Sequence, residues 1–134
     1  MPNKIFIDTS FIVALFIPKE KHHERAKKIL PMIDKKEKVI CQSVINETIA
    51  LVNKKAGVEA SKQVYKVMLD YFTIITENME LYNDSMNILI KYHKLSLTDS
   101  IIINLMKRNN IYEVVSFDED FDRVNGIVRI YHDL

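Results

Sequence analysis

The chain has 134 residues, of which 48% are hydrophobic and 28% charged, a composition typical of a globular protein rather than a disordered one. This length predicts a single domain over residues 1–134, and the two glycines and three prolines argue against long flexible linkers. The formal net charge of +1 excludes the strongly basic surface of a dedicated DNA-binding protein. An enzyme that binds nucleic acid briefly remains compatible with this charge.

Cysteine content and hydropathy predict a cytoplasmic location. Cys41 is the only cysteine, so no intrachain disulfide can form, and its apolar neighbours predict a small buried core residue. The N-terminus reaches Asp8 without the apolar stretch of a signal peptide. No segment approaches the roughly 20 apolar residues that a membrane span needs.

Short apolar runs alternate with amphipathic segments along the chain. The apolar runs predict strands over residues 4–8, 38–41, 72–76, 113–117 and 128–131. Three- and four-residue spacings predict helices over residues 9–16, 20–36, 43–55, 58–71, 78–93 and 99–107. Ser43 and Thr98 are expected to cap helices, Gly57 to end one, and Pro31 to kink or divide another. Strands that alternate with helices favour a three-layer α/β fold, with a central parallel sheet of four to five strands flanked by helices.

Four acidic residues either adjoin long apolar runs or lie within one, and we call them the acidic set: Asp8, Glu47, Asp99 and Asp118. Two of them stand at or just beyond the carboxyl end of a predicted strand, where parallel sheets collect functional groups. Carboxylates packed together repel one another unless a cation or shared protons neutralise them. Oxygen ligands suit Mg²⁺ or Mn²⁺ better than Zn²⁺. The acidic set therefore predicts a metal-dependent site.

Structural roles are the alternative for each member taken singly. Asp8 could be a helix N-cap, and Asp99 a first-turn acid that complements the helix dipole. Glu47 is predicted at the flank of an apolar helix face, where a half-buried carboxylate needs a partner. No lysine or arginine lies between Lys38 and Lys54, so that partner is a distant cation or a metal ion.

The acidic run at residues 118–122 suggests a calcium loop, but the glycine and glutamate that such a loop needs are replaced by Arg123 and Arg129. Phe121 is expected to pack inward, which leaves Asp118 as the best ligand candidate of the run. The remaining acids of the run are expected to be solvated: Glu119, Asp120 and Asp122.

Other chemistries fit the sequence less well. A haloacid-dehalogenase-type phosphatase needs a second Asp where Ser10 stands, and a response-regulator receiver needs an acidic pair and a lysine that are both absent here. His22 and His23 are adjacent and cannot both bind one ion from a helix. The basic residues around them alternate with glutamates, as on a solvated helix face. Phosphate contact is the open alternative for several cations: Lys19, Lys21, Lys54, Lys55 and Arg108.

The segments IFIDTSFIVALF, LTDSIIINLMKR and VVSFDEDFDRVNGI, with Glu47 between the first two, resemble a PIN domain of the small prokaryotic type exemplified by VapC toxins. The resemblance covers nearly the whole chain. It implies a PIN-like fold, frequent homodimers, and Mg²⁺- or Mn²⁺-dependent cleavage of RNA. It also implies that the acidic set is catalytic, with Ser10 as a supporting hydroxyl. Ser116 stands where family members often have Thr, and it keeps the hydroxyl.

On this resemblance we expect a metal-dependent endoribonuclease, the toxin of a toxin–antitoxin pair, with RNA as substrate and an antitoxin protein as partner. Asp8 and Asp99 are expected to hold the main ion, while Glu47 and Asp118 orient its waters or hold a second ion. Aromatic residues on the two central helices predict a homodimer: Tyr65, Tyr71, Tyr82 and Tyr92. A PIN-fold scaffold that binds RNA or protein without cutting is the alternative.

Overall fold

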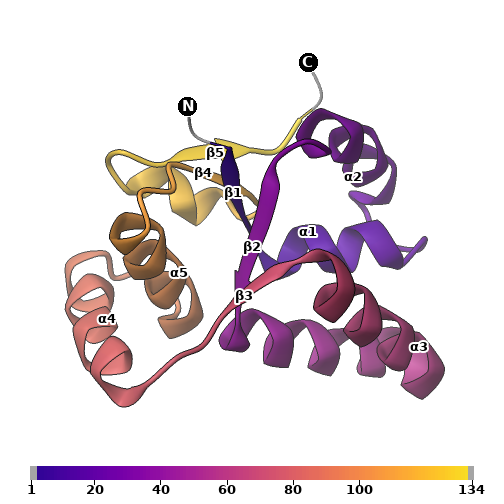
Figure 1. The fold of residues 1–134 in the computed structure, drawn as a ribbon, viewed down its shortest axis with the longest axis horizontal. Coiled ribbons are helices and arrows are strands. Elements are labelled where there is room, and N and C mark those ends of the chain that lie inside the picture. The colour runs from indigo at the N-terminus through magenta and orange to yellow at the C-terminus, as the bar shows by residue number, and fades with distance from the viewer. Residues whose placement is uncertain (1–2, 133–134) are drawn as a thin grey trace.

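The computed structural model describes residues 3–132 as a five-stranded parallel sheet between two layers of helices (Figure 1). The strands are β1 (Lys4–Ile7), β2 (Glu37–Cys41), β3 (Thr73–Ile75), β4 (Glu113–Val115) and β5 (Val128–Ile130). The helices are α1 (Thr9–Phe16), α2 (His23–Ile29), α3 (Gln42–Tyr71), α4 (Met79–Lys91) and α5 (Leu97–Arg108). Two short 3-10 segments complete the fold, η1 (Leu30–Ile33) and η2 (Glu119–Arg123). The predicted fold class is confirmed.

The strands are ordered β3-β2-β1-β4-β5, and every pairing is parallel. Strand β1 lies at the centre because its apolar run, Ile5 to Ile7, is buried on both faces of the sheet. Helices α4 and α5 cover one face, and α1, α2 and α3 cover the other (Figure 1). All five strands therefore end at one edge, which is where α1 and α3 begin.

Proline and glycine set two of the helix boundaries. The helix expected over residues 20–36 is shorter, because it begins at His23 and gives way at Leu30 to a 3-10 turn that contains Pro31. Gly57 lies within α3 at φ +90°, so it divides the segment into two helical halves, as expected of a helix-ending glycine.

Two predicted helix caps are wrong. Helix α5 begins at Leu97 and is capped by Ser96, whose hydroxyl accepts the Asp99 N–H at 3.1 Å, so Thr98 already lies inside the helix. Helix α3 begins at Gln42, and Ser43 lies in its first turn rather than before it. In α5 the polar Ser96, two positions before Thr98, supplies the capping oxygen, whereas the N-cap of α3 is Cys41, whose side chain makes no capping hydrogen bond.

Cys41 is fully buried at the end of β2, as predicted, and burial raises the pKa of its thiol. None of the helices within residues 3–132 combines the length and apolar character needed to cross a membrane.

Candidate functional site

The acidic set lines one surface cavity of about 360 Å³ at the carboxyl edge of the sheet. Asp8 directly follows β1, and Asp118 lies three residues beyond β4. Glu47 comes from α3, and Asp99 from the first turn of α5. Four separate elements thus deliver one carboxylate each to a cavity of the size that commonly binds small ligands.

Asp8 is buried, and its carboxylate is held through one oxygen. Oδ2 accepts the Ser10 hydroxyl at 2.8 Å, the Ser116 hydroxyl at 2.7 Å and, at 3.4 Å, the Ser10 N–H. No hydrogen bond within residues 3–132 reaches Oδ1. Burial raises the pKa of Asp8, and these hydrogen bonds only partly offset that effect. Asp8 is therefore a helix N-cap, as its structural alternative predicted, and also a cavity residue with one oxygen to spare.

Backbone N–H groups orient both supporting hydroxyls. The Phe117 N–H donates to Ser10 Oγ at 3.0 Å, and the Asp118 N–H donates to Ser116 Oγ at 3.0 Å. Each serine oxygen thus accepts from the backbone and turns its single proton toward Asp8. Ser116 is completely buried and thus shielded from water, whereas Ser10 is half-buried and lines the cavity.

Asp99 carries a charge that its surroundings in the cavity disfavour. Burial raises its pKa to about 7, and the negative charges of Asp8, Asp118 and Glu47 add to the rise. The nearby Ser96 hydroxyl lowers it only partly. Within residues 3–132, no member of the acidic set makes an ion pair with a lysine, arginine or histidine. The cavity therefore concentrates negative charge that the described chain does not neutralise.

Glu47 differs from its prediction, because it is exposed to solvent rather than half-buried on the core face. Thr48, the next residue, and Val44 point into the core instead. Desolvation of the carboxylate still raises the pKa of Glu47, the charge of Asp8 adds to this, and the Thr98 hydroxyl lowers it in part. Its carboxylate thus faces the cavity although most of the residue is in contact with water.

Two further charged residues line the cavity, and sequence reasoning did not assign them to it. Asp120 was expected to be solvated, but the turn of η2 brings it beside Asp118, whose Oδ1 accepts the Asp120 N–H at 2.9 Å. Lys94, in the loop between α4 and α5, is exposed at the rim. Their positions depend on loop geometry, which the sequence pattern does not encode.

The oxygen-rich lining fits a hard divalent cation, because Mg²⁺ and Mn²⁺ prefer carboxylate and water ligands. Within residues 3–132, no three His, Cys, Asp or Glu side chains already have the spacing of ligands around one ion. Mg²⁺ is commonly held by only one or two carboxylates and keeps several of its waters. Two residues are best suited to hold such an ion. Asp8 has an oxygen, Oδ1, without a hydrogen bond, and the charge of Asp99 is repelled by the neighbouring carboxylates.

The fold and this cavity define an α/β protein with an acidic site at the carboxyl edge of its sheet. The model of the PIN domain family matches residues 5–127, and the chain belongs to this family.

Comparisons with individual proteins point in the same direction. The chain is 30% identical to ribonuclease VapC6 of Methanocaldococcus jannaschii, in an alignment that covers 94% of this chain and 95% of the relative. Its fold is similar to that of VapC20 from Mycobacterium tuberculosis, a sarcin–ricin loop cleaving toxin (TM-score 0.83, 23% identity, 92% and 96% of the two chains). It is also similar to a chain of a toxin–antitoxin complex from Klebsiella pneumoniae (TM-score 0.70, 21% identity, 96% and 98%). The chain is thus a VapC-like PIN-domain protein.

Proposed function

We propose that this protein is an endoribonuclease that depends on a divalent metal ion, Mg²⁺ or Mn²⁺, and cleaves phosphodiester bonds of RNA. The observation that carries the proposal is the shared cavity of the acidic set, in which the described residues supply no pairing cation. The 30% identity to a protein described as a ribonuclease supports the reaction type.

In this proposal Asp8 and Asp99 hold the ion, which when bound supplies positive charge to the phosphate and acidifies water. Ser10 and Ser116 fix the Asp8 carboxylate by their two hydroxyl donors, so that Oδ1 keeps its direction. Glu47, the most exposed member of the acidic set, is placed to accept a proton from the attacking water or to orient it. Asp118 is the second water-orienting carboxylate or a ligand of a second ion.

Lys94 has a different part in the proposal. It is an exposed cation at the rim of an acidic cavity, and it makes no ion pair within residues 3–132. A phosphate that enters the cavity passes this ammonium group. Lys94 therefore counteracts the repulsion between the carboxylates and the RNA backbone.

We further propose that the protein is a single-domain, cytoplasmic toxin whose partner is an antitoxin protein, because its structural relatives include a toxin and a toxin–antitoxin complex. A homodimer is part of the same proposal. Tyr65 and Tyr71 on the second half of α3 are exposed, at 47% and 75%. Tyr82 and Tyr92 are half-buried and support a dimer less. Light scattering at micromolar concentration tests this, and a pure monomer would count against it.

Cleavage of labelled RNA by the purified protein tests the main proposal. We expect cleavage of single-stranded or loop RNA with Mg²⁺ or Mn²⁺ and none in EDTA. Undiminished cleavage in EDTA would overturn the metal requirement. Binding of RNA with no turnover in either metal would favour the alternative, a scaffold that does not cut.

A further inference from the structure

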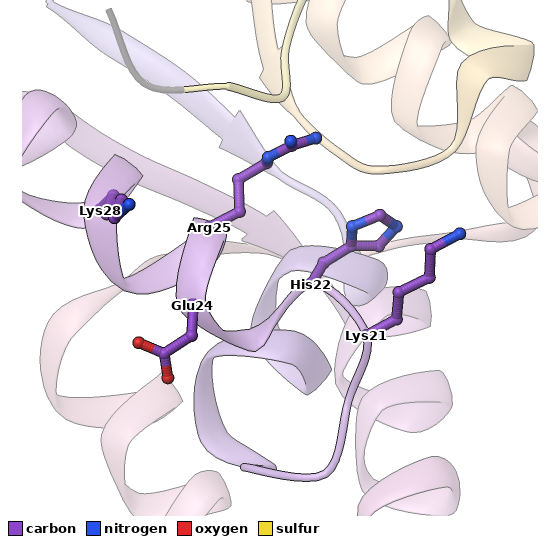
Figure 2. Close-up of a pocket in the computed structure, with 5 residues that line it drawn as sticks. All are labelled: Lys21, His22, Glu24, Arg25 and Lys28. Carbon is purple, nitrogen blue, oxygen red and sulfur yellow. The ribbon is translucent and has the colours of Figure 1, made fainter.

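A line of three adjoining cavities leads from the acidic cavity to the start of α2. Ser10 and Leu51 line both the acidic cavity and a second cavity. Lys21 and His22 line both this second cavity and a third one, shown in Figure 2. The three cavities therefore adjoin one another in a row, which begins at the candidate catalytic carboxylates and which we call the path.

The far end of this path is basic. Its cations are Lys21, Arg25 and Lys28, and none of them makes an ion pair within residues 3–132. In Figure 2 the side chains of Lys21 and Arg25 extend away from the Glu24 carboxylate, which points to the opposite side. Because the whole chain has a formal net charge of only +1, this group of cations is a local concentration rather than part of a basic surface.

The two glutamates that line the second and third cavities lie beside other lysines. Glu20 in the second cavity accepts a 2.9 Å hydrogen bond from Lys55, and Glu24 lies 3.9 Å from Lys27. Their charges thus oppose the basic group only weakly. Polyanions are attracted to such a surface, since each lysine or arginine that meets a phosphate releases a counterion.

A pair of stacked rings lies between the acidic and the basic ends. The His22 ring stacks on Phe117 with centroids 4.4 Å apart and planes at 16°. Phe117 is fixed from below by the buried Phe11 ring, at 6.2 Å, and by its own N–H bond to Ser10. Partial burial lowers the pKa of His22, and the charges of Lys21 and Arg25 lower it further. Next to the acidic cavity, the path thus contains the flat His22 ring, which Phe117 holds in place.

We propose that this path binds the stretch of single-stranded RNA next to the bond to be cut, with its phosphates on Lys21, Arg25 and Lys28 and a base stacked on the His22–Phe117 pair. The inference rests on the proposed function, because the path specifies how far, and in which direction from the acidic cavity, the RNA substrate extends over the surface. Bases stack on aromatic rings only when they are released from a duplex, so the occupant is a single strand.

Salt-dependent binding tests the phosphate contacts. A labelled oligouridylate of about 12 nucleotides is titrated with the Asp99→Asn protein, which binds without cutting, and with the same protein carrying Lys21→Gln, Arg25→Gln and Lys28→Gln. Three lost contacts should make the slope of log affinity against log salt shallower by about 2, at roughly 0.7 per phosphate of a single strand. The matched control carries Lys35→Gln, Lys66→Gln and Lys107→Gln, three exposed lysines outside the path.

Substitution of the ring tests the stacking. His22→Ala should weaken binding at least about five-fold with an unchanged salt slope, whereas His22→Phe should stay within about two-fold of the parent. A merely structural histidine predicts the same loss for both variants. Thermal melting of every variant excludes unfolding as the cause of a change.

The outcomes separate this inference from the proposed function. If wild-type protein cleaves RNA with Mn²⁺ but the path variants and the control variants bind alike, the path is overturned and the nuclease stands. If the path variants bind RNA like the controls but lose binding to a protein partner, the surface belongs to that partner, and the RNA path is overturned. If the wild type neither binds nor cleaves any RNA, the proposed function fails, and the path fails with it.

Discussion

Glu77 and the acidic set both lie at the carboxyl edge of the sheet, but Glu77 is surrounded by hydrogen-bond donors and the acidic set by its own negative charges. Glu77, two residues beyond β3, accepts the Ser43 N–H and the Ser43 hydroxyl, both at 2.6 Å, and the Tyr82 hydroxyl at 2.9 Å. Burial alone would raise the pKa of Glu77, but these hydrogen bonds together lower it. Asp99, in contrast, faces three other acids, and its pKa is raised to about 7.

The difference separates an acid with a structural role from acids that we propose to be functional. Glu77 finds its donors in the protein, because Ser43 belongs to the first turn of α3, whose free N–H groups and dipole favour an anion there. The acidic set also accepts hydrogen bonds, three of them at Asp8, but none of its members has a paired cation within residues 3–132. A carboxylate surrounded by donors stabilises the fold, whereas carboxylates that face one another without a paired cation fit the metal ion that we propose.

The largest expected effect concerns catalysis. Asp8→Asn or Asp99→Asn should lower the rate of RNA cleavage at least ~10²-fold, because each removes a charge that positions the ion. Asp70→Asn, an exposed acid on the second half of α3, is the matched control and should leave the rate unchanged. A near-normal rate in either cavity variant would assign that residue a structural role only.

A smaller loss of rate is expected when the support of Asp8 is removed. Ser116→Ala deletes the 2.7 Å hydrogen bond to Oδ2, so the carboxylate loses one of its two hydroxyl donors and the rate should fall about 10-fold. Ser85→Ala removes an equally buried serine hydroxyl far from the cavity, and serves as the control. Equal rates for both variants would contradict the supporting role.

Glu77 should show the opposite pattern, with lost stability and retained activity. Glu77→Gln replaces a charged acceptor of three hydrogen bonds, which should lower the free energy of unfolding by roughly 1–3 kcal/mol and Tm by several degrees. Glu59→Gln changes the same charge at an exposed position of α3. Thermal melting compares the two, and a Glu77→Gln protein with unchanged Tm would contradict the contrast drawn above.

Asp99→Asn should change stability with the opposite sign when metal is absent. In EDTA the substitution relieves repulsion among the carboxylates, so Tm should rise by a few degrees. Added Mg²⁺ should raise the Tm of the wild type by mass action and that of the variant much less. Scanning fluorimetry with and without Mg²⁺ measures both effects, and an equal response of the two proteins would remove Asp99 from the metal site.

The smallest effect is a dependence on pH. Because the pKa of Asp99 rises from 3.8 to about 7 on folding, the folded protein binds more protons than the unfolded chain between these values. Its contribution to stability therefore falls as pH rises through this window. In EDTA, the Tm advantage of Asp99→Asn over the wild type should grow from about pH 5 to about pH 8. A constant difference across this range would contradict the raised pKa.

The sequence predicts the elements well and the pairing of side chains poorly. Apolar runs identify all five strands, because the inner strands β1, β2 and β4 are largely buried and the edge strands β3 and β5 are half-buried. The sequence also predicts that the acidic set lies together, since the carboxyl ends of the strands in a parallel sheet share one edge. Glu77 was not singled out, because its donor Ser43 stands 34 residues earlier and no local spacing links the two. The cavity positions of Asp120 and Lys94 depend on loop conformation in the same way.

The hydrogen bond between Ser116 and Asp8 joins residues 108 positions apart, and this separation has a consequence for synthesis on the ribosome. Strand β1 emerges early, but β4, its neighbour, and the loop that carries Ser116 and Asp118 emerge last among the site elements. Domains fold as their segments leave the ribosome, and long-range parallel pairings form late. The acidic cavity is therefore complete only after the segment with Ser116 and Asp118 has left the ribosome and joined β1, and we expect a nascent chain without this segment to lack the cavity.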